Sequence, residues 1–324
     1  MRTRITFDQA DRMLKSRTAL LDAGRTPRRL QEDERSGALV RVHRGWFVDA
    51  QAWTKLWPEG QHLLRVIAVA RAGTVTVFTH QSAAVLWGLP LRGDRDVLVH
   101  ALINGARHSR VAAGVARHQM VVDDDDVTVR HGILCTTLHR TVLDLARTTR
   151  LETAVSAGDA ALRLVAVDGQ LYDTNIADEW RTDLERMCDP GLRGIRQARW
   201  VTDFIDGRAQ LPGESVSRIQ LHRLGFAPPP LQVRVVGAAD DEYFLDFGFT
   251  RSRVFGEFDG DGKYLEPDLR RAETPADVVL AEKRREDDIR GVTGWGFARW
   301  GNEDIRTPEN LGRRLAAFGV FPPG

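Results

Sequence analysis

Cysteines, long apolar runs and familiar catalytic motifs are scarce in this chain of 324 residues. Its two cysteines, Cys135 and Cys188, have no Cys-x-x-Cys or Cys/His ligand spacing around them. They therefore predict buried free thiols rather than a disulfide framework or a structural zinc site. No run of about 18 apolar residues occurs, and the first residues, MRTRITFDQADRM, lack the apolar segment of a secretory signal. We expect a cytoplasmic protein that does not span a membrane.

Missing motifs also exclude several enzyme classes. The sequence contains no Walker loop and no Rossmann glycine fingerprint, and Ser82 lacks the Gly-x-Ser-x-Gly turn of hydrolases. His80 and His139 lie in apolar motifs without a carboxylate or cysteine at ligand spacing, so we interpret them as structural histidines. The four adjacent aspartates at 123–126 lack the spaced ligands and glycine of a calcium-binding loop and predict a solvated loop.

The composition is that of a folded protein with an uneven charge distribution. Hydrophobic residues make up 42% of the chain and charged residues 28%, and the length suggests two or three domains. Residues 1–50 hold eleven Lys/Arg and seven Asp/Glu, a net charge of +4, whereas residues 210–300 hold thirteen and sixteen, a net charge of −3. A basic N-terminal module favours phosphate, and an acidic C-terminal one favours a cation.

The first fifty residues predict a winged helix. FDQADRMLKS reads as a helix, a break follows at Asp22-Ala23-Gly24, TPRRLQEDERSG reads as a second helix, and ALVRVHRGWFVD as two strands that turn at His43-Arg44-Gly45. Thr26 is a natural N-cap, followed by Pro27 at the first helical position.

In a helix-turn-helix the start of the second helix approaches base edges, which assigns DNA contacts here to Arg25, Thr26, Arg28 and Arg29. Arg44 at the tip of the wing would reach a phosphate or the minor groove. The alternative is a small protein-interaction module whose arginines are only solvated.

The C-terminal region predicts an α/β unit in the order helix, three strands, helix, strand. The segments are GESVSRIQLHRLG, LQVRVVG, EYFLDFGF, RVFGEFDG, the charged helix PADVVLAEKRREDDIRG and GWGFARW.

A hairpin that closes about Arg251-Ser252 pairs positions summing to 503, which places Asp246 opposite Glu257. Cross-strand Cβ atoms lie about 4.5–5.5 Å apart, close enough for two carboxylates to share a divalent ion. Asp259 falls on the same face as Glu257 because side chains alternate. The opposite face is predicted to be apolar, with Leu245, Phe247, Phe249, Val254 and Phe258.

Adjacent like charges repel, and a bound cation would relieve that repulsion. Oxygen ligands without histidine favour Mg²⁺ or Mn²⁺. The alternative is an ordinary solvated face of the sheet.

Residues 213–300 resemble the PD-(D/E)XK nuclease superfamily, in its very-short-patch-repair-like branch, through GES, PPPLQVRV, LDF, GEFDGDGKY and EKRREDDIRG with ARW. The resemblance implies a Mg²⁺-dependent endonuclease that leaves 5′-phosphate ends and holds its metal with Glu214, Asp246 and Glu257. Asp259 stands where the superfamily has lysine. Two alternatives follow: Lys263 or Lys283 supplies the positive charge, or the site is a retired one.

Residues 7–49 resemble the winged-helix domain of AbiEi-type antitoxins through RTPRRLQEDERSGALVRVHRGWFVD. THQSAAVLWGLP and ILCTTLHRTVLDLAR resemble the middle region of the same proteins. The resemblance implies DNA binding, autoregulation and a cognate toxin encoded nearby.

Taken together, the sequence predicts an α+β multidomain protein. We expect a winged helix at 1–55, a mixed α/β middle domain at 56–165, a helical linker at 166–208 and a nuclease-like domain at 209–324. The expected function is a metal-dependent DNA endonuclease in which Glu214, Asp246 and Glu257 hold the metal and Asp259 and Lys263 assist. The alternative is a non-catalytic, antitoxin-like DNA-binding regulator with a degenerate nuclease fold. A homodimer is expected for a double-strand cutter, which needs a second active site.

Overall fold

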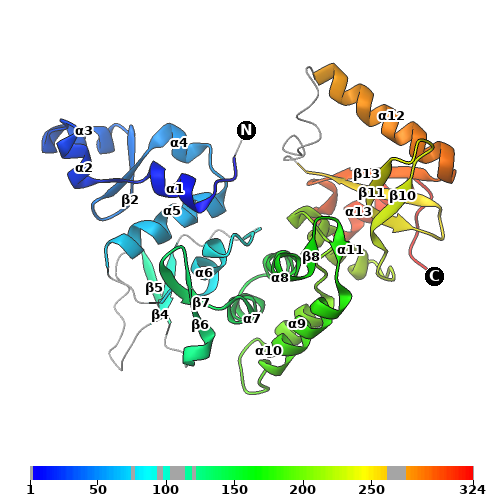
Figure 1. Ribbon diagram of the computed structural model, residues 1–324, viewed down its shortest axis with the longest axis horizontal. Helices are drawn as coiled ribbons and strands as arrows, with labels where there is room; N and C mark the ends of the chain where they lie inside the picture. The colour runs from blue at the N-terminus through cyan, green and yellow to red at the C-terminus, as the bar shows by residue number, and fades with distance from the viewer. Residues whose placement is uncertain are drawn as a thin grey trace. The chain divides into compact units, whose positions relative to one another are not determined.

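The computed structural model describes residues 3–73, 77–92, 98–102, 114–118, 122–260 and 275–323 (Figure 1). They form two compact units: unit 1 comprises residues 1–161 and 174–205, and unit 2 comprises residues 162–173 and 206–324. The expected boundary at residue 209 lies close to Asp206, where unit 2 resumes. The expected segment 1–55, residues 56–161 of the segment 56–165, and most of 166–208 lie together in unit 1. Both units mix helices with small sheets, which confirms the α+β class.

Unit 1 begins with three short helices and a three-stranded sheet in the order β1-β3-β2. The elements are α1 (Phe7–Met13), β1 (Lys15–Ser16), α2 (Arg17–Asp22), α3 (Pro27–Arg35), β2 (Leu39–His43) and β3 (Trp46–Asp49). Side chains cap the helices: Thr6 forms a capping box on α1, Ser16 accepts from the Ala19 amide, and Thr26 accepts from the Arg29 amide.

The first helix is shorter than FDQADRMLKS predicted. α1 ends at Met13 because Leu14 turns extended, and Lys15–Ser16 form strand β1 against β3. The hydroxyl of Ser16 then caps a separate helix, α2. Lys15 and Ser16, which were predicted to continue the first helix, therefore form strand β1, and Ser16 also caps α2.

The rest of unit 1 packs helices against short strands. Its elements are α4 (Ala50–Thr54), α5 (Pro58–Arg71), α6 (His80–Leu86), β4 (Val99–Leu102), β5 (Val115–His118), a 3-10 turn (Asp124–Asp126), β6 (Val127–Arg130), β7 (Ile133–Thr136), α7 (Leu138–Thr148), the first part of α8 (Leu151–Ala166), α9 (Thr174–Arg186) and α10 (Ile195–Phe204). β4 and β5 are parallel, β6 and β7 antiparallel, and Phe78 bridges both pairs through Ala101 and Cys135. Both cysteines are buried and free, as predicted.

Unit 2 is built on a four-stranded sheet in the order β10-β11-β12-β13, in which β12 and β13 run parallel. Its elements are β8 (Val167–Asp168), β9 (Leu171–Tyr172), α11 (Pro212–Arg223), β10 (Leu231–Val236), β11 (Glu242–Phe249), β12 (Val254–Asp259), α12 (Pro275–Thr293), β13 (Gly296–Gly301), a 3-10 turn (Asp304–Arg306) and α13 (Pro308–Ala316). This is the predicted order of helix, three strands, helix, strand.

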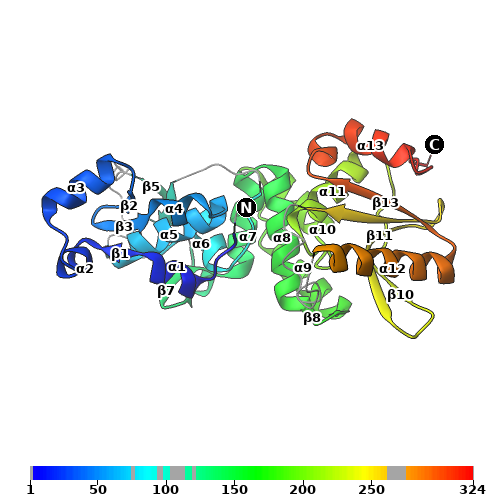
Figure 2. The ribbon, with the colours of Figure 1, turned by 90° about the horizontal axis from the view of Figure 1, so that it is seen from above.

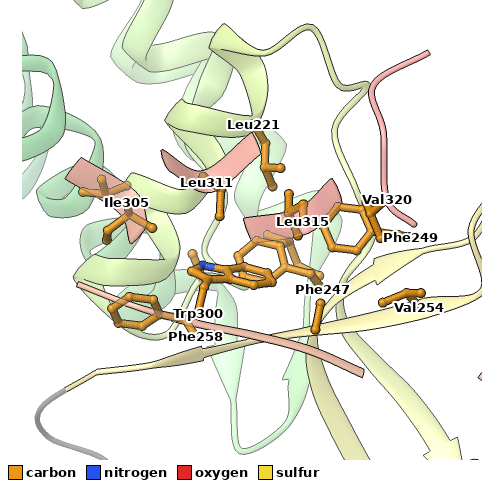
Figure 3. Close-up of a cluster of buried hydrophobic side chains, with 14 residues drawn as sticks. Leu221, Phe247, Phe249, Val254, Phe258, Trp300, Ile305, Leu311, Leu315 and Val320 are labelled. Atoms are coloured by element: carbon orange, nitrogen blue, oxygen red, sulfur yellow. The ribbon is translucent and has the colours of Figure 1, made fainter. Parts of the chain in front are cut away.

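Two apolar clusters sandwich this sheet between helices. On one face, Trp300, Phe247 and Phe258 pack with Leu221 of α11 and Leu311 and Leu315 of α13, as Figure 3 shows. On the other face, Leu245, Phe255 and Phe297 pack with Ile289 of α12. Figure 2 shows α13 and α12 on opposite sides of the strands. Unit 2 therefore has helix, sheet and helix layers.

Candidate functional site

The hairpin of β11 and β12 has the predicted register. Phe247 pairs with Gly256, Gly248 with Phe255, and Phe249 with Val254, so each pair sums to 503. The ladder stops there. Beyond it, Asp246 Oδ2 accepts a hydrogen bond from the backbone N–H of Phe258, 2.9 Å away. Asp246 therefore lies beside the backbone of Glu257, and its carboxylate bridges the two strands where their backbone pairing ends.

Leu245 lies on the face opposite to Phe247, so its assignment to the shared apolar face is wrong. β10 pairs Leu231 with Phe247 and Val233 with Leu245, and Gln232 between them has a φ of +47°. A left-handed residue of this kind interrupts the pleat of β10, and the ladder skips Gln232 and Asp246 at this point. On the two sides of this interruption, Phe247 packs toward α11 and Leu245 toward α12.

Glu257 is buried between two arginines. Glu257 is only 3% exposed. Arg285 of α12 donates a hydrogen bond from Nη1 to Oε1 of Glu257 at 2.9 Å. Arg299 Nη2 lies 2.8 Å from Oε2, an ion pair without hydrogen-bond geometry. Arg299 is also the ladder partner of Glu257 in the parallel pair β12–β13, so the sheet register brings the two charges together. Glu257 is therefore neutralised by side chains of the protein itself.

The same arginines hold three further carboxylates. Arg299 contacts Glu282, lies 2.7 Å from Glu286 Oε1, and lies 3.6 Å from Asp259 Oδ2. Arg285 Nη1 lies 3.2 Å from Glu282 Oε1. Burial alone would lower the pKa of both guanidinium groups, but Glu257 and Glu282 outweigh it and raise their pKa. Both arginines stay charged, and Glu257 and Asp259 are linked through Arg299.

Glu214 approaches the sheet from the other side. It is buried in the first turn of α11, and its Oε2 accepts the backbone N–H of Gln210 at 2.8 Å. The adjacent Gly213 lies directly on the ring of Phe258, so closely that a Cβ there would come within 1.9 Å of Cε1. Because Phe258 faces α11 while Glu257 faces α12, the sheet stands between the two acidic side chains.

The predicted source of positive charge, Lys263, stays a prediction. Lys263 falls in 261–274, outside the described residues, and Lys283 is exposed on α12. Arg285 and Arg299, which sequence reasoning did not single out, reach Glu257 instead.

These carboxylates do not fit a Mg²⁺ or Mn²⁺ site in this arrangement. Both oxygens of Glu257 face guanidinium groups, and Asp246 and Glu214 each accept a backbone N–H through one oxygen. Among the described residues, the one group of three His, Cys, Asp or Glu side chains with ligand atoms within 4.8 Å of one another is His80, His100 and His118. No trio drawn from Glu214, Asp246, Glu257 and Asp259 meets that spacing.

The predicted DNA-contacting residues gather at the start of α3 and at the β2–β3 turn. The side chain of Arg28 is 90% exposed and that of Arg29 66% exposed, and Arg44 is exposed at the turn. Arg28 Nε lies 3.3 Å from Glu32, and Arg29 Nε lies 3.1 Å from Asp33, which also pairs with Arg25. Thr26 caps α3 through its hydroxyl, so its role in the structure is to position the helix.

His80 has neighbours that its local sequence does not reveal. Its ring stacks on His118 with centroids 4.1 Å apart, and His100 Nδ1 lies 2.8 Å from His118 Nε2. Burial, followed by the charges of His118 and His100, lowers the pKa of His80 to about 2, so its imidazole is neutral. His139, in contrast, stacks on Trp180, which fits its predicted structural role.

Comparisons with known proteins place no function on this chain. No protein-family model matches it. Two proteins of Mycobacterium tuberculosis, "Uncharacterized protein Rv2248" of strain ATCC 25618 / H37Rv and "Uncharacterized protein MT2308" of strain CDC 1551 / Oshkosh, are each 27% identical to it over 292 residues. The alignment covers 90% of this chain and 96% of each relative, so the similarity extends over both units. In the described part of the chain, no helix has the length and apolar character needed to cross a bilayer.

Proposed function

We propose that this protein is a DNA-binding transcriptional regulator in which unit 2 has a nuclease-like but non-catalytic fold. The proposal that unit 2 is non-catalytic rests on one observation: Glu257 forms ion pairs with both Arg285 and Arg299. A carboxylate whose charge is already balanced by two guanidinium groups gains little from a metal ion, which those groups also repel. Asp259 in the place of the usual lysine supports the same conclusion.

The DNA-binding half rests on the arrangement of the first fifty residues. A winged helix accounts for the order helix, strand, helix, helix and two-stranded hairpin, and for the sheet order β1-β3-β2. In this proposal α3 is the recognition helix and the β2–β3 turn is the wing. Arg28 and Arg29 project from the first turn of α3, and Arg44 from the wing. Their ion pairs to Glu32 and Asp33 involve exposed arginines and are worth about 1 kcal/mol or less, so phosphate groups can replace them.

DNA binding is tested by fluorescence anisotropy with a labelled duplex at several salt concentrations. Replacing both Arg28 and Arg29 by alanine should weaken binding and reduce the slope of log K against log salt by about 2, because two phosphate contacts are lost. Arg186→Ala is the matched control, since Arg186 also belongs to unit 1, is 73% exposed and forms a similar surface ion pair with Asp183. Equal affinity and slope in wild type and double variant would remove the winged helix from the proposal.

Cleavage separates the regulator from an endonuclease. That second candidate is favoured by one observation, the hairpin register that brings Asp246 beside Glu257. Wild type should leave supercoiled plasmid and single-stranded DNA intact in the presence of Mg²⁺ or Mn²⁺. If it cuts DNA, and Asp246→Ala and Glu257→Ala both abolish cutting, the non-catalytic half of the proposal is wrong.

A further inference from the structure

Three histidines from three separate elements of unit 1 meet at one place. His80 opens α6, His100 lies in β4, and His118 ends β5. β4 and β5 run parallel with His100 opposite Ala116, so His118, two residues further along, projects from the same face as His100. The backbone N–H of Thr79 donates to the carbonyl of His100 at 3.0 Å, which ties the start of α6 to this strand.

The spacing of the ring nitrogens suits a metal ion. One nitrogen of each ring lies within 4.8 Å of the others, and His100 Nδ1 lies 2.8 Å from His118 Nε2. Tetrahedral Zn²⁺ with Zn–N bonds of about 2.0–2.1 Å separates its nitrogen ligands by about 3.3 Å. To accept an ion of this size, the His100–His118 pair would open by about 0.5 Å, and ligand atoms as far apart as 4.8 Å would close by up to about 1.5 Å.

The surroundings orient the ring of His80 as the second shell of a metal site does, and they fix the backbone of His100. His80 Nδ1 lies 3.0 Å from the hydroxyl of Thr79, which leaves Nε2 of this ring to act as the ligand. The hydroxyl of Ser82 accepts the backbone N–H of His100 at 2.8 Å and lies 3.0 Å from Nε2 of His62. Ligating histidines usually have the second ring nitrogen fixed by such a partner.

The backbone of His80 adds an independent observation. Its φ is +49°, a left-handed conformation that is uncommon for a residue with a side chain. Such a conformation persists where the surroundings determine the position of the residue, and it concentrates at functional sites. Here it turns the first side chain of α6 toward His118, on which the ring stacks.

We propose that His80, His100 and His118 form a binding site for a divalent transition-metal ion of the Zn²⁺ type. Three imidazoles without thiolate or carboxylate exclude a preference for Mg²⁺ or Ca²⁺, which take oxygen ligands. Within the described residues no fourth His, Cys, Asp or Glu joins the group, so the proposal assigns three protein ligands. The site is independent of the acidic cluster in unit 2 and of the arginines on α3.

Metal content tests this site directly. Untagged full-length protein is incubated with ZnCl₂, passed through a gel-filtration column and analysed by atomic absorption, and it should retain one zinc ion per chain. His118→Asn should bind zinc at least about 100-fold more weakly, since one of three ligands is lost. His139→Asn, which alters a histidine of the same unit stacked on Trp180, should retain wild-type binding. Wild type without zinc, or His118→Asn with wild-type affinity, overturns the proposal.

A second variant guards against an effect of folding alone. His118→Cys replaces one metal ligand by another, so its Co²⁺ complex should show the sulfur-to-cobalt charge-transfer absorption that only direct ligation produces. Circular dichroism confirms that the variant is folded. A folded His118→Cys protein that takes up no Co²⁺, or binds it without this absorption, also overturns the proposal.

Discussion

The ion pairs of Glu257 with Arg285 and Arg299 predict that replacing Glu257 by an uncharged side chain destabilises unit 2. In Glu257→Gln, the side chain keeps its size but loses ion pairs of 2.9 and 2.8 Å with Arg285 and Arg299. Removing one partner of a buried ion pair costs about 3–5 kcal/mol. Arg285 keeps Glu282 at 3.2 Å and Arg299 keeps Glu286 at 2.7 Å, so we expect the low end of that range, about 3 kcal/mol. The Tm of unit 2 should fall by about 10 °C.

The assay is thermal unfolding followed by circular dichroism in EDTA at pH 7. Asp259→Asn serves as the control, because Asp259 is 44% exposed and 3.6 Å from Arg299, and it should cost less than about 1 kcal/mol. An acidic metal site without its ion would behave in the opposite way, since removing one of several crowded carboxylates relieves repulsion. A Tm that rises or stays constant in Glu257→Gln would refute the arginine-held arrangement and favour the endonuclease.

Three further outcomes test other parts of the structure. Burial raises the pKa of Asp144 to about 6 against its ion pairs with arginines, so its contribution to stability is fully present below about pH 4 and is lost as pH rises through 6. Urea unfolding of wild type between pH 4 and 7 should show this loss of about 3 kcal/mol, and Asp144→Asn should not. Gly213→Ala should lower the free energy of unfolding by about 1–3 kcal/mol in urea, because the added Cβ collides with the ring of Phe258, and an unchanged value would contradict that packing. Thr26→Ala should cost about 1 kcal/mol in thermal unfolding through loss of the α3 cap, whereas Thr26→Ser should cost little; equal losses would show that the cap is unimportant.

The sequence predicted the helices and strands of unit 2 because each of them depends on the pattern of residues within its own segment. The alternation in EYFLDFGF and RVFGEFDG and the short turn between them fix a hairpin, so the pairing of Phe249 with Val254 follows from counting residues. The reversal at Gln232 does not, because nothing in its residue type requires a positive φ. Leu245 was misplaced because the alternation of side chains breaks between Leu245 and Phe247, where the ladder to β10 skips Asp246 and Gln232.

The residues that surround Glu257 and the three histidines could not be predicted, because they come from segments far apart in the sequence. Arg299 meets Glu257 through a parallel pairing with a helical crossover between the strands, and no turn fixes the register of such a pair. His80, His100 and His118 likewise come together only when α6 packs on β4 and β5. Their spacings of 20 and 18 residues resemble no compact ligand motif, so the sequence favoured structural histidines.

The parallel pairing of β12 with β13 also bears on the order of folding. Arg285 and Arg299 lie 28 and 42 positions beyond Glu257, so both ion pairs close long loops, whereas the β11–β12 hairpin closes a short one. Contacts of long sequence separation that form after the transition state leave the folding rate unchanged and slow unfolding. We therefore expect the ion pairs of Glu257 to form late in folding and to slow the unfolding of unit 2.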